Sequence, residues 1–166
     1  MSEIKIRSWH RNDFPIVRKI LLQTWLDTYS FIPEEDIRFH LEKFYSEEKL
    51  NLLYTDPDTQ CFISEYEGVP VGWMKLFDNK SQVRFYVSSL YVLPQYQGYG
   101  IGKLLMNKAE EIAKSKNYDR IWLGVMSDNK KALKWYEKHG FYFPEEEPFQ
   151  MGNTKVMHLI SYKLIQ

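Results

Sequence analysis

Hydrophobic positions along the 166-residue chain recur with two different periods, and each period predicts one type of element. Apolar residues that alternate with polar ones indicate strands, whereas apolar residues spaced three and four apart indicate the buried face of a helix. The clearest helical pattern begins at Ile101 and continues through Leu104, Leu105, Ala109 and Ala113. The predicted elements in chain order are a strand at 4–9, helices at 10–29 and 33–54, strands at 61–67, 69–77 and 84–92, a helix at 101–113, a strand at 120–125, a helix at 129–139, and strands at 141–143 and 156–163.

This order places two helices after the first strand, then three consecutive strands, and then helices that alternate with the remaining strands. The turn at Glu67-Gly68 and the polar segment at 78–82 are short, so the three consecutive strands are predicted to form an antiparallel meander. No repeat, low-complexity stretch or linker interrupts the chain, and its length is that of one ordinary domain. We therefore expect one mixed α/β domain over residues 1–166.

Composition and charge narrow the classes of partner. Lys plus Arg and Asp plus Glu both number 22, so there is no overall basic field to attract a nucleic acid or an anionic membrane. No apolar run is long enough for a membrane span, and the first residues lack the apolar centre of a secretory signal. The one cysteine, Cys61, lies in a strand-like run, which favours a buried thiol and a reducing compartment. We expect a cytoplasmic protein with no nucleic-acid or membrane partner.

Three glycines, Gly98, Gly100 and Gly102, stand at alternate positions at the start of a predicted helix. The first turn of a helix leaves amide N–H groups unpaired, and glycine lets a phosphate approach that backbone closely. For any one glycine, a tight turn that requires positive φ is the structural alternative. A Walker loop is excluded because Lys103 is followed by Leu104, and a Rossmann loop is disfavoured by both the spacing and the position after a meander. The pattern predicts a different phosphate-bearing ligand.

The glycines belong to a longer string, Leu90-Tyr91-Val92-x-Pro94-x-Tyr96-Gln97-Gly98-x-Gly100-Ile101-Gly102-x-x-Leu105. This string resembles the acetyl-coenzyme A motif of the GNAT N-acetyltransferases, Gln/Arg-x-x-Gly-x-Gly/Ala. A later family motif is matched by Asn129, Ala132, Tyr136, Gly140 and Phe141, residues that a capped helix with a buried face would also explain. With the matching order of elements, the resemblance implies the GNAT fold, a twisted mixed sheet of six to seven strands with helices on both faces.

The resemblance also implies roles for individual residues, with acetyl-CoA as co-substrate and no metal. The loop amides would hold the coenzyme pyrophosphate, and the end of the preceding strand would pair with pantetheine. The implied coenzyme-binding residues are Leu90, Tyr91, Val92, Gln97, Gly98, Tyr99, Gly100, Ile101, Gly102, Lys103, Asn129 and Tyr136. The Val92 amide would polarise the thioester carbonyl, and Tyr136 would be the general acid that protonates the leaving thiolate. Lys131 and Lys138 are further candidates for contacts with the coenzyme phosphates.

Three more segments are Thr24-x-x-Asp27-Thr28-Tyr29, Ile121-Trp122-Leu123-Gly124-Val125 and Phe149-x-Met151-Gly152. They are similar to the PaiA-type branch of bacterial polyamine N-acetyltransferases, which implies acetyl transfer to a primary amine of spermidine, spermine or a similar small polycation. Carboxylates and aromatic faces suit a long cation. The candidate acceptor-binding residues are Asp27, Tyr29, Glu34, Ser88 and Phe149, with Glu35 and the run Glu145, Glu146 and Glu147 as further candidates, and a solvated surface explains the run of three glutamates better than a binding site does.

Two positions depart from the family pattern. Ser88 stands where relatives commonly carry a glutamate base, and a serine hydroxyl holds a water but does not replace a carboxylate. His158 stands where the branch has an acidic residue, and it is either an assisting base or a packed strand histidine. Two rival functions therefore stay open, acetylation of a protein or peptide amine and a coenzyme-binding regulator with weak catalysis. A monomer and a homodimer are both compatible with the sequence.

Overall fold

The computed structural model describes residues 2–165, which form a seven-stranded sheet in the order β1-β2-β3-β4-β5-β7-β6. Neighbouring strands are antiparallel except for the parallel pair β4 and β5, which confirms the expected mixed sheet. The strands are β1 (Ile4–Ser8), β2 (Thr59–Tyr66), β3 (Val69–Asn79), β4 (Arg84–Val92), β5 (Arg120–Met126), β6 (Tyr142–Met151) and β7 (Thr154–Leu164). The helices are α1 (Phe14–Thr28), α2 (Glu34–Tyr45), α3 (Glu47–Thr55), α4 (Ile101–Ser115) and α5 (Lys130–Lys138), with short 3-10 turns at Arg11–Asp13 and Pro94–Tyr96.

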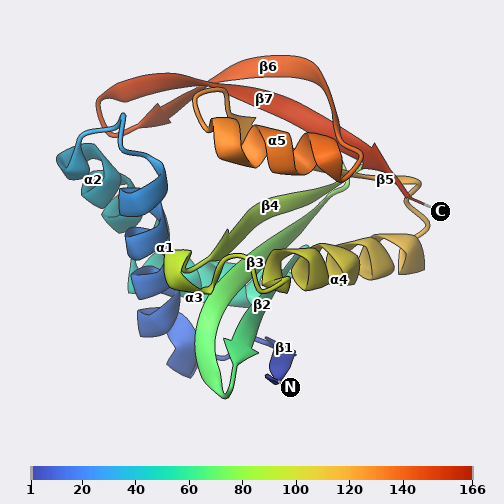
Figure 1. Ribbon diagram of the computed structural model, residues 1–166, viewed down its shortest axis with the longest axis horizontal. Coiled ribbons are helices and arrows are strands. Elements are labelled where there is room, and N and C mark those ends of the chain that lie inside the picture. The colour runs from blue at the N-terminus through green and yellow to red at the C-terminus, as the bar shows by residue number, and fades with distance from the viewer. Residues whose placement is uncertain (1, 166) are drawn as a thin grey trace.

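Helices cover both faces of the sheet. Trp73 of β3 packs against Tyr45, the last residue of α2, with ring centroids 6.0 Å apart. Met74, the next residue of β3, points to the opposite face together with its β2 partner Phe62. Lys108 of α4 lies 5.9 Å from the Phe62 ring, so α4 covers that opposite face. Figure 1 shows β6 and β7 arching over α5, while β2, β3, β4 and α4 occupy the other half of the molecule.

The two parallel strands at the centre of the sheet separate along their length. β4 and β5 are in register at Tyr86 and Trp122, near the start of each strand. Beyond this point the residues of both strands, 87–92 and 123–126, line one cleft. Ligands of α/β sheets bind at the carboxyl ends of parallel strands where the strand order changes, so the fold places a binding site here.

The helix predicted at 33–54 is two helices, because the chain is interrupted at Ser46. Ser46 has extended backbone angles (φ −62°, ψ 164°), and its side chain accepts a hydrogen bond from the Lys49 amide at 3.3 Å. It therefore caps α3, and the acidic residues Glu47 and Glu48 occupy the first turn. Serine followed by acidic residues is typical of the start of a helix, so the sequence contains a local signal for this break that the prediction of one helix did not include.

The strand predicted at 141–143 was too short, since β6 continues to Met151. Pro144 and Pro148 are the reason for the wrong prediction, because proline disfavours a central strand. β6 is an edge strand that pairs only with β7, so a proline nitrogen without a hydrogen disturbs no ladder on its open side.

The turn between β6 and β7 is fastened to α2 by Asp36. Its Oδ1 accepts a hydrogen bond from the Asn153 amide at 2.9 Å, and its Oδ2 accepts one from the Thr154 hydroxyl at 2.6 Å. These hydrogen bonds lower the pKa of the Asp36 carboxyl. Gly152 has φ +59°, and a Cβ there would lie 2.6 Å from the Asp36 Cα, so only glycine fits. This contact holds α2 beside the β6–β7 hairpin, and both α2 and β6 line the cleft.

Within residues 2–165, no helix is long and apolar enough to cross a bilayer. Cys61 is buried as expected, and burial raises the pKa of its thiol to about 12.

Candidate active site

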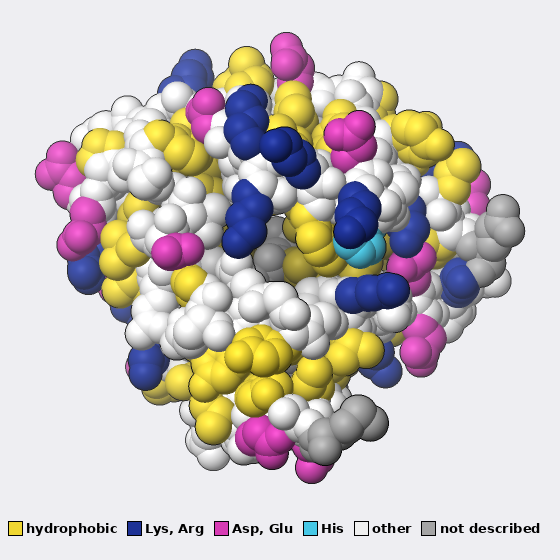
Figure 2. Space-filling view, in the orientation of Figure 1, with side chains coloured by type: hydrophobic (Ala, Val, Ile, Leu, Met, Phe, Trp, Pro, Cys, Tyr) yellow, Lys and Arg dark blue, Asp and Glu magenta, His cyan; other side chains and the backbone are white. Residues whose placement is uncertain are grey.

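A cleft of about 1370 Å³ opens between the separating ends of β4 and β5. Pockets for one small molecule usually measure about 300–1,000 Å³, so this cleft has room for an extended coenzyme and a second molecule. Figure 2 shows a hollow near the centre of the molecule, bordered mainly by Lys and Arg side chains. The lysines that line the cleft are Lys75, Lys103, Lys131, Lys134 and Lys138.

The glycine loop before α4 uses its three glycines in two different ways. Gly98 (φ +89°) and Gly100 (φ +83°) are in the left-handed region that favours glycine, and a Cβ at either would meet nothing within 4 Å. Gly102 lies inside the first turn of α4, where a Cβ would make an ordinary 3.6 Å contact with Trp135. The backbone conformation therefore requires glycine at positions 98 and 100 but not at 102. A tight turn with positive φ is the structural explanation that applies to the first two.

The amides of this loop are unpaired and suited to an anion. Within residues 2–165, none of the N–H groups from Gly98 to Lys103 donates a hydrogen bond to another part of the chain, and no side chain caps α4. The partial positive charge of the helix N-terminus adds to these unpaired donors. Together with the nearby lysines, the loop matches a pyrophosphate, which supplies acceptor oxygens and negative charge.

The end of β4 presents an open backbone edge to the cleft. Leu93 donates its amide to Val71 of β3 at 2.8 Å, so the preceding residue, Val92, directs its N–H and C=O the other way, toward β5. The Val92 carbonyl accepts a hydrogen bond from Gln97 Nε2 at 3.0 Å, and Lys131 of α5 donates to Gln97 Oε1 at 3.0 Å. Gln97 thus links β4 to α5, while the Val92 amide has no partner in strand β3. An extended amide chain such as pantetheine fits this edge as an added strand would.

Tyr136 of α5 directs a phenol toward the cleft. Its ring packs edge-to-face on Trp135 and Phe141, at 5.2 and 5.4 Å. Its hydroxyl makes no hydrogen bond to the chain as described from residue 2 to 165, and Tyr136 lines the cleft. Burial, followed by the nearby Tyr91, raises the pKa of this phenol, so it remains protonated at neutral pH.

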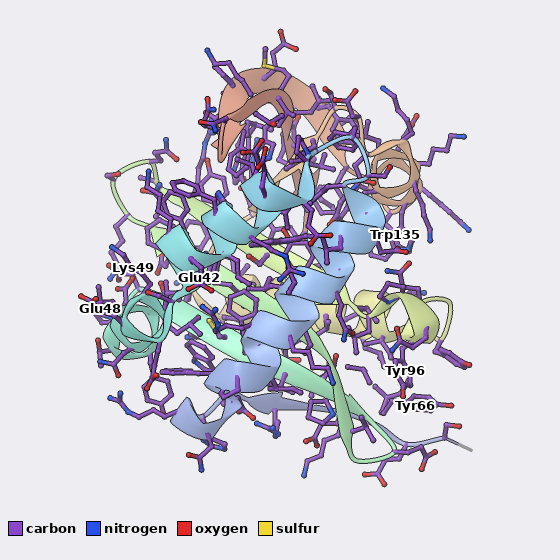
Figure 3. The ribbon with its side chains drawn as sticks, turned by 90° about the vertical axis from the view of Figure 1, so that its left-hand side faces the viewer. Glu42, Glu48, Lys49, Tyr66, Tyr96 and Trp135 are labelled. Atoms are coloured by element: carbon purple, nitrogen blue, oxygen red, sulfur yellow. The ribbon has the colours of Figure 1, made fainter. Side chains whose placement is uncertain are left out.

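Asn129 has a structural use at the mouth of the same cleft. Its Oδ1 accepts a hydrogen bond from the Ala132 amide at 3.3 Å and so caps α5. Asn129 also lines the cleft. Tyr99 does not line the cleft. Its ring is exposed and lies 5.1 Å from Tyr66, in an aromatic group with Tyr96; Figure 3 shows Tyr66 and Tyr96 side by side, away from Trp135.

The residues expected to bind the acceptor divide into two groups. Tyr29, Ser88 and Phe149 line the cleft. Ser88 is exposed and unpaired in register, at a bulge where β3 and β4 shift between the Lys75 and Leu76 pairings. The acidic candidates lie elsewhere on the surface, outside the cleft lining: Asp27 is exposed, Glu34 pairs with Arg38 at 2.8 Å, Glu145 pairs with Arg84 at 2.8 Å, and Glu35, Glu146 and Glu147 are exposed.

The structure adds several side chains to this end of the cleft that the sequence did not single out, namely Trp25, His40, Phe44, Tyr45 and Lys75. They come from α1, α2 and β3, and no spacing in the sequence connects them to the glycine motif. His158 stacks on Phe149 with ring centroids 4.2 Å apart and planes 6° apart. Burial lowers the pKa of both His40 and His158 to about 4, so both imidazoles are neutral at pH 7.

None of the cleft-lining residues is Asp or Glu. No group of three or more His, Cys, Asp or Glu side chains in the described part of the chain is placed to hold a metal ion. The cleft therefore offers anion-binding amides, lysines, a phenol and neutral imidazoles, and no carboxylate base.

The chain belongs to the acetyltransferase (GNAT) family, whose sequence profile matches residues 9–141. It is accordingly an acetyl-CoA-dependent N-acetyltransferase. An uncharacterised N-acetyltransferase encoded in the pepI 3′ region of Lactobacillus delbrueckii subsp. lactis is 27% identical over 163 residues, which are 93% of this chain and 94% of the relative.

Two solved structures extend the comparison. The PaiA N-acetyltransferase of Thermoplasma acidophilum, determined with coenzyme A, is 25% identical and superposes with a TM-score of 0.83 over 98% of this chain and 99% of that one. A chimera of the spermidine N-acetyltransferase SpeG of Vibrio cholerae is 21% identical, with a TM-score of 0.72 over 97% of this chain and 95% of that one. The first likeness agrees with the PaiA-type resemblance of the sequence, and the second shows a shared fold.

Proposed function

We propose that this N-acetyltransferase acetylates a primary amine of a small molecule. The amine attacks the thioester carbonyl carbon directly, inside the cleft. One observation carries the proposal. The unpaired amides of residues 98–103, the open edge of β4 and the hydroxyl of Tyr136 all face one continuous cleft. Backbone donors for a pyrophosphate, an edge for pantetheine and a proton donor are the parts that acyl transfer from a thioester requires.

Bound acetyl-CoA would supply the activated acetyl group, and this chain's residues would do the rest. The amides from Gly98 to Lys103 bind the pyrophosphate, and the β4 edge at Leu90 and Val92 orients the pantetheine arm. The Val92 N–H donates to the thioester carbonyl oxygen, where negative charge develops. As the C–N bond forms and the C–S bond breaks, the Tyr136 hydroxyl gives its proton to the departing sulfur. Water then returns to Tyr136 the proton that the amine has lost.

Removal of that proton from the amine has no carboxylate to depend on. Ser88 lies at the bulge of β4, and its side chain lines the cleft. Its hydroxyl would hold a water molecule there. His158 and His40 are neutral and accept hydrogen bonds, but a pKa near 4 makes each a weak base. We infer that the amine reacts from the small fraction that is already neutral in solution.

The polyamines spermidine and spermine are the acceptors that the PaiA-type resemblance implies, and the likeness to the PaiA structure supports them as the first acceptors to assay. Tyr29 and Phe149, two of the aromatic residues expected to contact a polyamine, line the cleft. The acidic residues expected to do so do not, which is the observation that weakens this assignment.

The experiment measures thiol release from acetyl-CoA with a panel of amines, lysine peptides and free amino acids, for the wild type and Tyr136→Phe. We expect Tyr136→Phe to lower kcat about a hundredfold, because general acid catalysis contributes about 10²- to 10⁴-fold, while KM for acetyl-CoA changes less than about twofold. Tyr142→Phe, which removes a hydroxyl from an exposed tyrosine outside the cleft, is the matched control and retains wild-type kcat.

An unchanged kcat in Tyr136→Phe would remove Tyr136 from the mechanism. Turnover of peptides alone would establish the protein-acetylating alternative. Tight binding of acetyl-CoA without turnover of any amine would instead favour the regulator.

A further inference from the structure

The acceptor end of the cleft carries a charge pattern opposite to that expected of a polyamine site. Six side chains determine it: Trp25, His40, Tyr45, Lys75, Phe149 and His158. Five of them are uncharged at neutral pH, and the sixth is a cation. A long polycation that entered would lose its hydration, and no carboxylate among the described lining residues would compensate for that loss. The ammonium of Lys75 would also repel its positive charges.

Lys75 is half-buried and has no acidic partner. Its ammonium donates to the Tyr45 hydroxyl at 3.2 Å and lies 5.2 Å from the centre of that ring. Within residues 2–165 it makes no ion pair with an Asp or Glu, although ten such pairs occur elsewhere. Lys75 is in register with Ser89 on β4, directly beside the bulge at Ser88. A lysine inside a cleft and without a carboxylate partner is suited to bind an anionic group of a ligand.

The side chains on the same side of the cleft as Lys75 are aromatic rings, and none of them carries a charge at neutral pH. His158 stacks on Phe149, and the His40 ring lies 5.5 Å from Phe149 and 5.6 Å from Trp25. His40 Nδ1 is buried without a hydrogen-bond partner in the described chain. These rings pack against one another and form an uncharged aromatic wall of the cleft, against which a flat apolar group of a ligand can pack.

We propose that the acceptor is a small amino-acid-like amine whose carboxylate pairs with Lys75 and whose flat apolar side chain packs against the aromatic wall that includes Phe149 and His158. This inference rests on the acetyl transfer proposed above and specifies its second substrate. It assigns Lys75 as the residue that selects an anionic acceptor over a cationic one.

The chemistry of the amine agrees with a cleft that holds no carboxylate base. The α-amino group of a free amino acid is more basic than a peptide N-terminus, whose pKa is about 8, because its own carboxylate stabilises the ammonium, but it is less basic than a lysine-type amine, whose pKa is about 10.4. At pH 7.5 about a thousandth of a lysine-type amine is neutral and able to attack, and the neutral fraction of the amino acid's amine is larger. A site without a strong base therefore favours the amine that loses its proton more easily.

The test compares three acceptors under the same conditions: L-phenylalanine, L-phenylalaninamide and spermidine. The amide keeps the ring and the α-amino group but lacks the negative charge, and its amine loses a proton more readily, so a slower reaction has to come from lost binding. We expect kcat/KM for L-phenylalanine to exceed that for the amide and for spermidine by about tenfold or more, the effect of one charge-assisted hydrogen bond.

Variants of Lys75 locate the effect. Lys75→Met is expected to remove the preference for L-phenylalanine over its amide, and Lys75→Arg to retain most of it, while KM for acetyl-CoA stays within about twofold in both. Lys49→Met, which changes an exposed lysine of α3 labelled in Figure 3 and outside the cleft lining, is the matched control and keeps the preference.

The outcomes separate the two proposals. Faster turnover of spermidine, or equal turnover of L-phenylalanine and its amide, overturns the acceptor inference and leaves acetyl transfer to a small amine standing. A preference that survives in Lys75→Met also overturns it, because another group then selects the anion. Failure of every amine, with acetyl-CoA still bound, overturns the proposed reaction as well as the inference.

Discussion

The two ends of the cleft are built from different parts of the polypeptide. The end that we propose for the coenzyme, called the coenzyme end, consists mainly of backbone, namely the N–H groups from Gly98 to Lys103 and the open edge at Val92. The proposed acceptor end consists of side chains that five separate elements, α1, α2, β3, β6 and β7, bring together. A backbone site needs a particular chain conformation, whereas a side-chain site needs particular groups. The first end can therefore be common to many acetyltransferases, and the second sets which amine is used.

The largest expected effect on coenzyme binding comes from adding a side chain to the backbone of the glycine loop. Gly100→Val forces a β-branched residue into φ +83° and places new atoms on the ligand side of the loop. We expect KM for acetyl-CoA to rise about a hundredfold or more, with a circular dichroism spectrum like that of the wild type. Gly68→Val imposes similar strain at φ +78° in the β2–β3 turn, outside the cleft, and is the matched control. Equal losses of coenzyme binding in the two variants would show that strain alone is responsible.

A smaller expected effect is a dependence of stability on pH, which comes from two histidines at the acceptor end. His40 and His158 have folded-state pKa values of about 4, below the ordinary value of 6.5, because burial disfavours the charged imidazole. Below pH 6.5 the unfolded chain binds protons that the folded chain does not, so the free energy of unfolding falls between pH 6.5 and about 4. After allowance for solvent screening, each histidine contributes about 1 to 2 kcal/mol to this loss.

Urea denaturation at pH 7, 5.5 and 4.5 measures this loss of stability. His158→Gln should show a flatter dependence on pH than the wild type, whatever its stability at pH 7. Stability that stays constant from pH 7 to 4.5 would contradict the assignment of two neutral, buried imidazoles.

The smallest expected effect concerns the third glycine. Gly102→Ala keeps the backbone amide, adds a Cβ at 3.6 Å from Trp135 and improves helix propensity, so we expect activity within twofold and stability raised by about 0.5 kcal/mol. Gly124→Ala is the contrasting variant, because its Cβ would lie 3.2 Å from His158 Nδ1 at the acceptor end. We expect it to lower stability and to raise KM for the amine. Loss of coenzyme binding in Gly102→Ala would show that this glycine, too, is required by the loop.

The glycine loop that we propose for the coenzyme could be located from the sequence because its parts are close along the chain. Gly98 and Gly100 stand a few residues after Val92, and positive φ is a property that one residue type reveals. The order of strands and helices was predicted for the same reason, since each element is a local pattern. Only the helix break at Ser46 and the length of β6 were wrong, and both involve local signals read without their tertiary context.

The acceptor end could not be predicted in the same way. Lys75 lies within an ordinary strand and His40 within an ordinary amphipathic helix, and nothing in either segment shows that the two share a cleft. The acidic candidates suggested a cation site, but their side chains are exposed, and Glu34 and Glu145 pair with Arg38 and Arg84. Which side of a helix or strand meets a ligand is decided by packing between distant segments, and a single sequence does not report that.

The hydrogen bonds of Asp36 have a consequence for how the protein acquires its specificity. They join residues 117 and 118 positions apart, whereas the coenzyme loop and the end of β4 span about a dozen residues. Closing a long loop costs more chain entropy than closing a short one, and contacts of high sequence separation slow folding. We therefore expect the loop proposed to hold the acyl donor to form early in folding. The walls proposed to contact the amine are complete only when the β6–β7 turn reaches α2, so we expect selectivity to be acquired later.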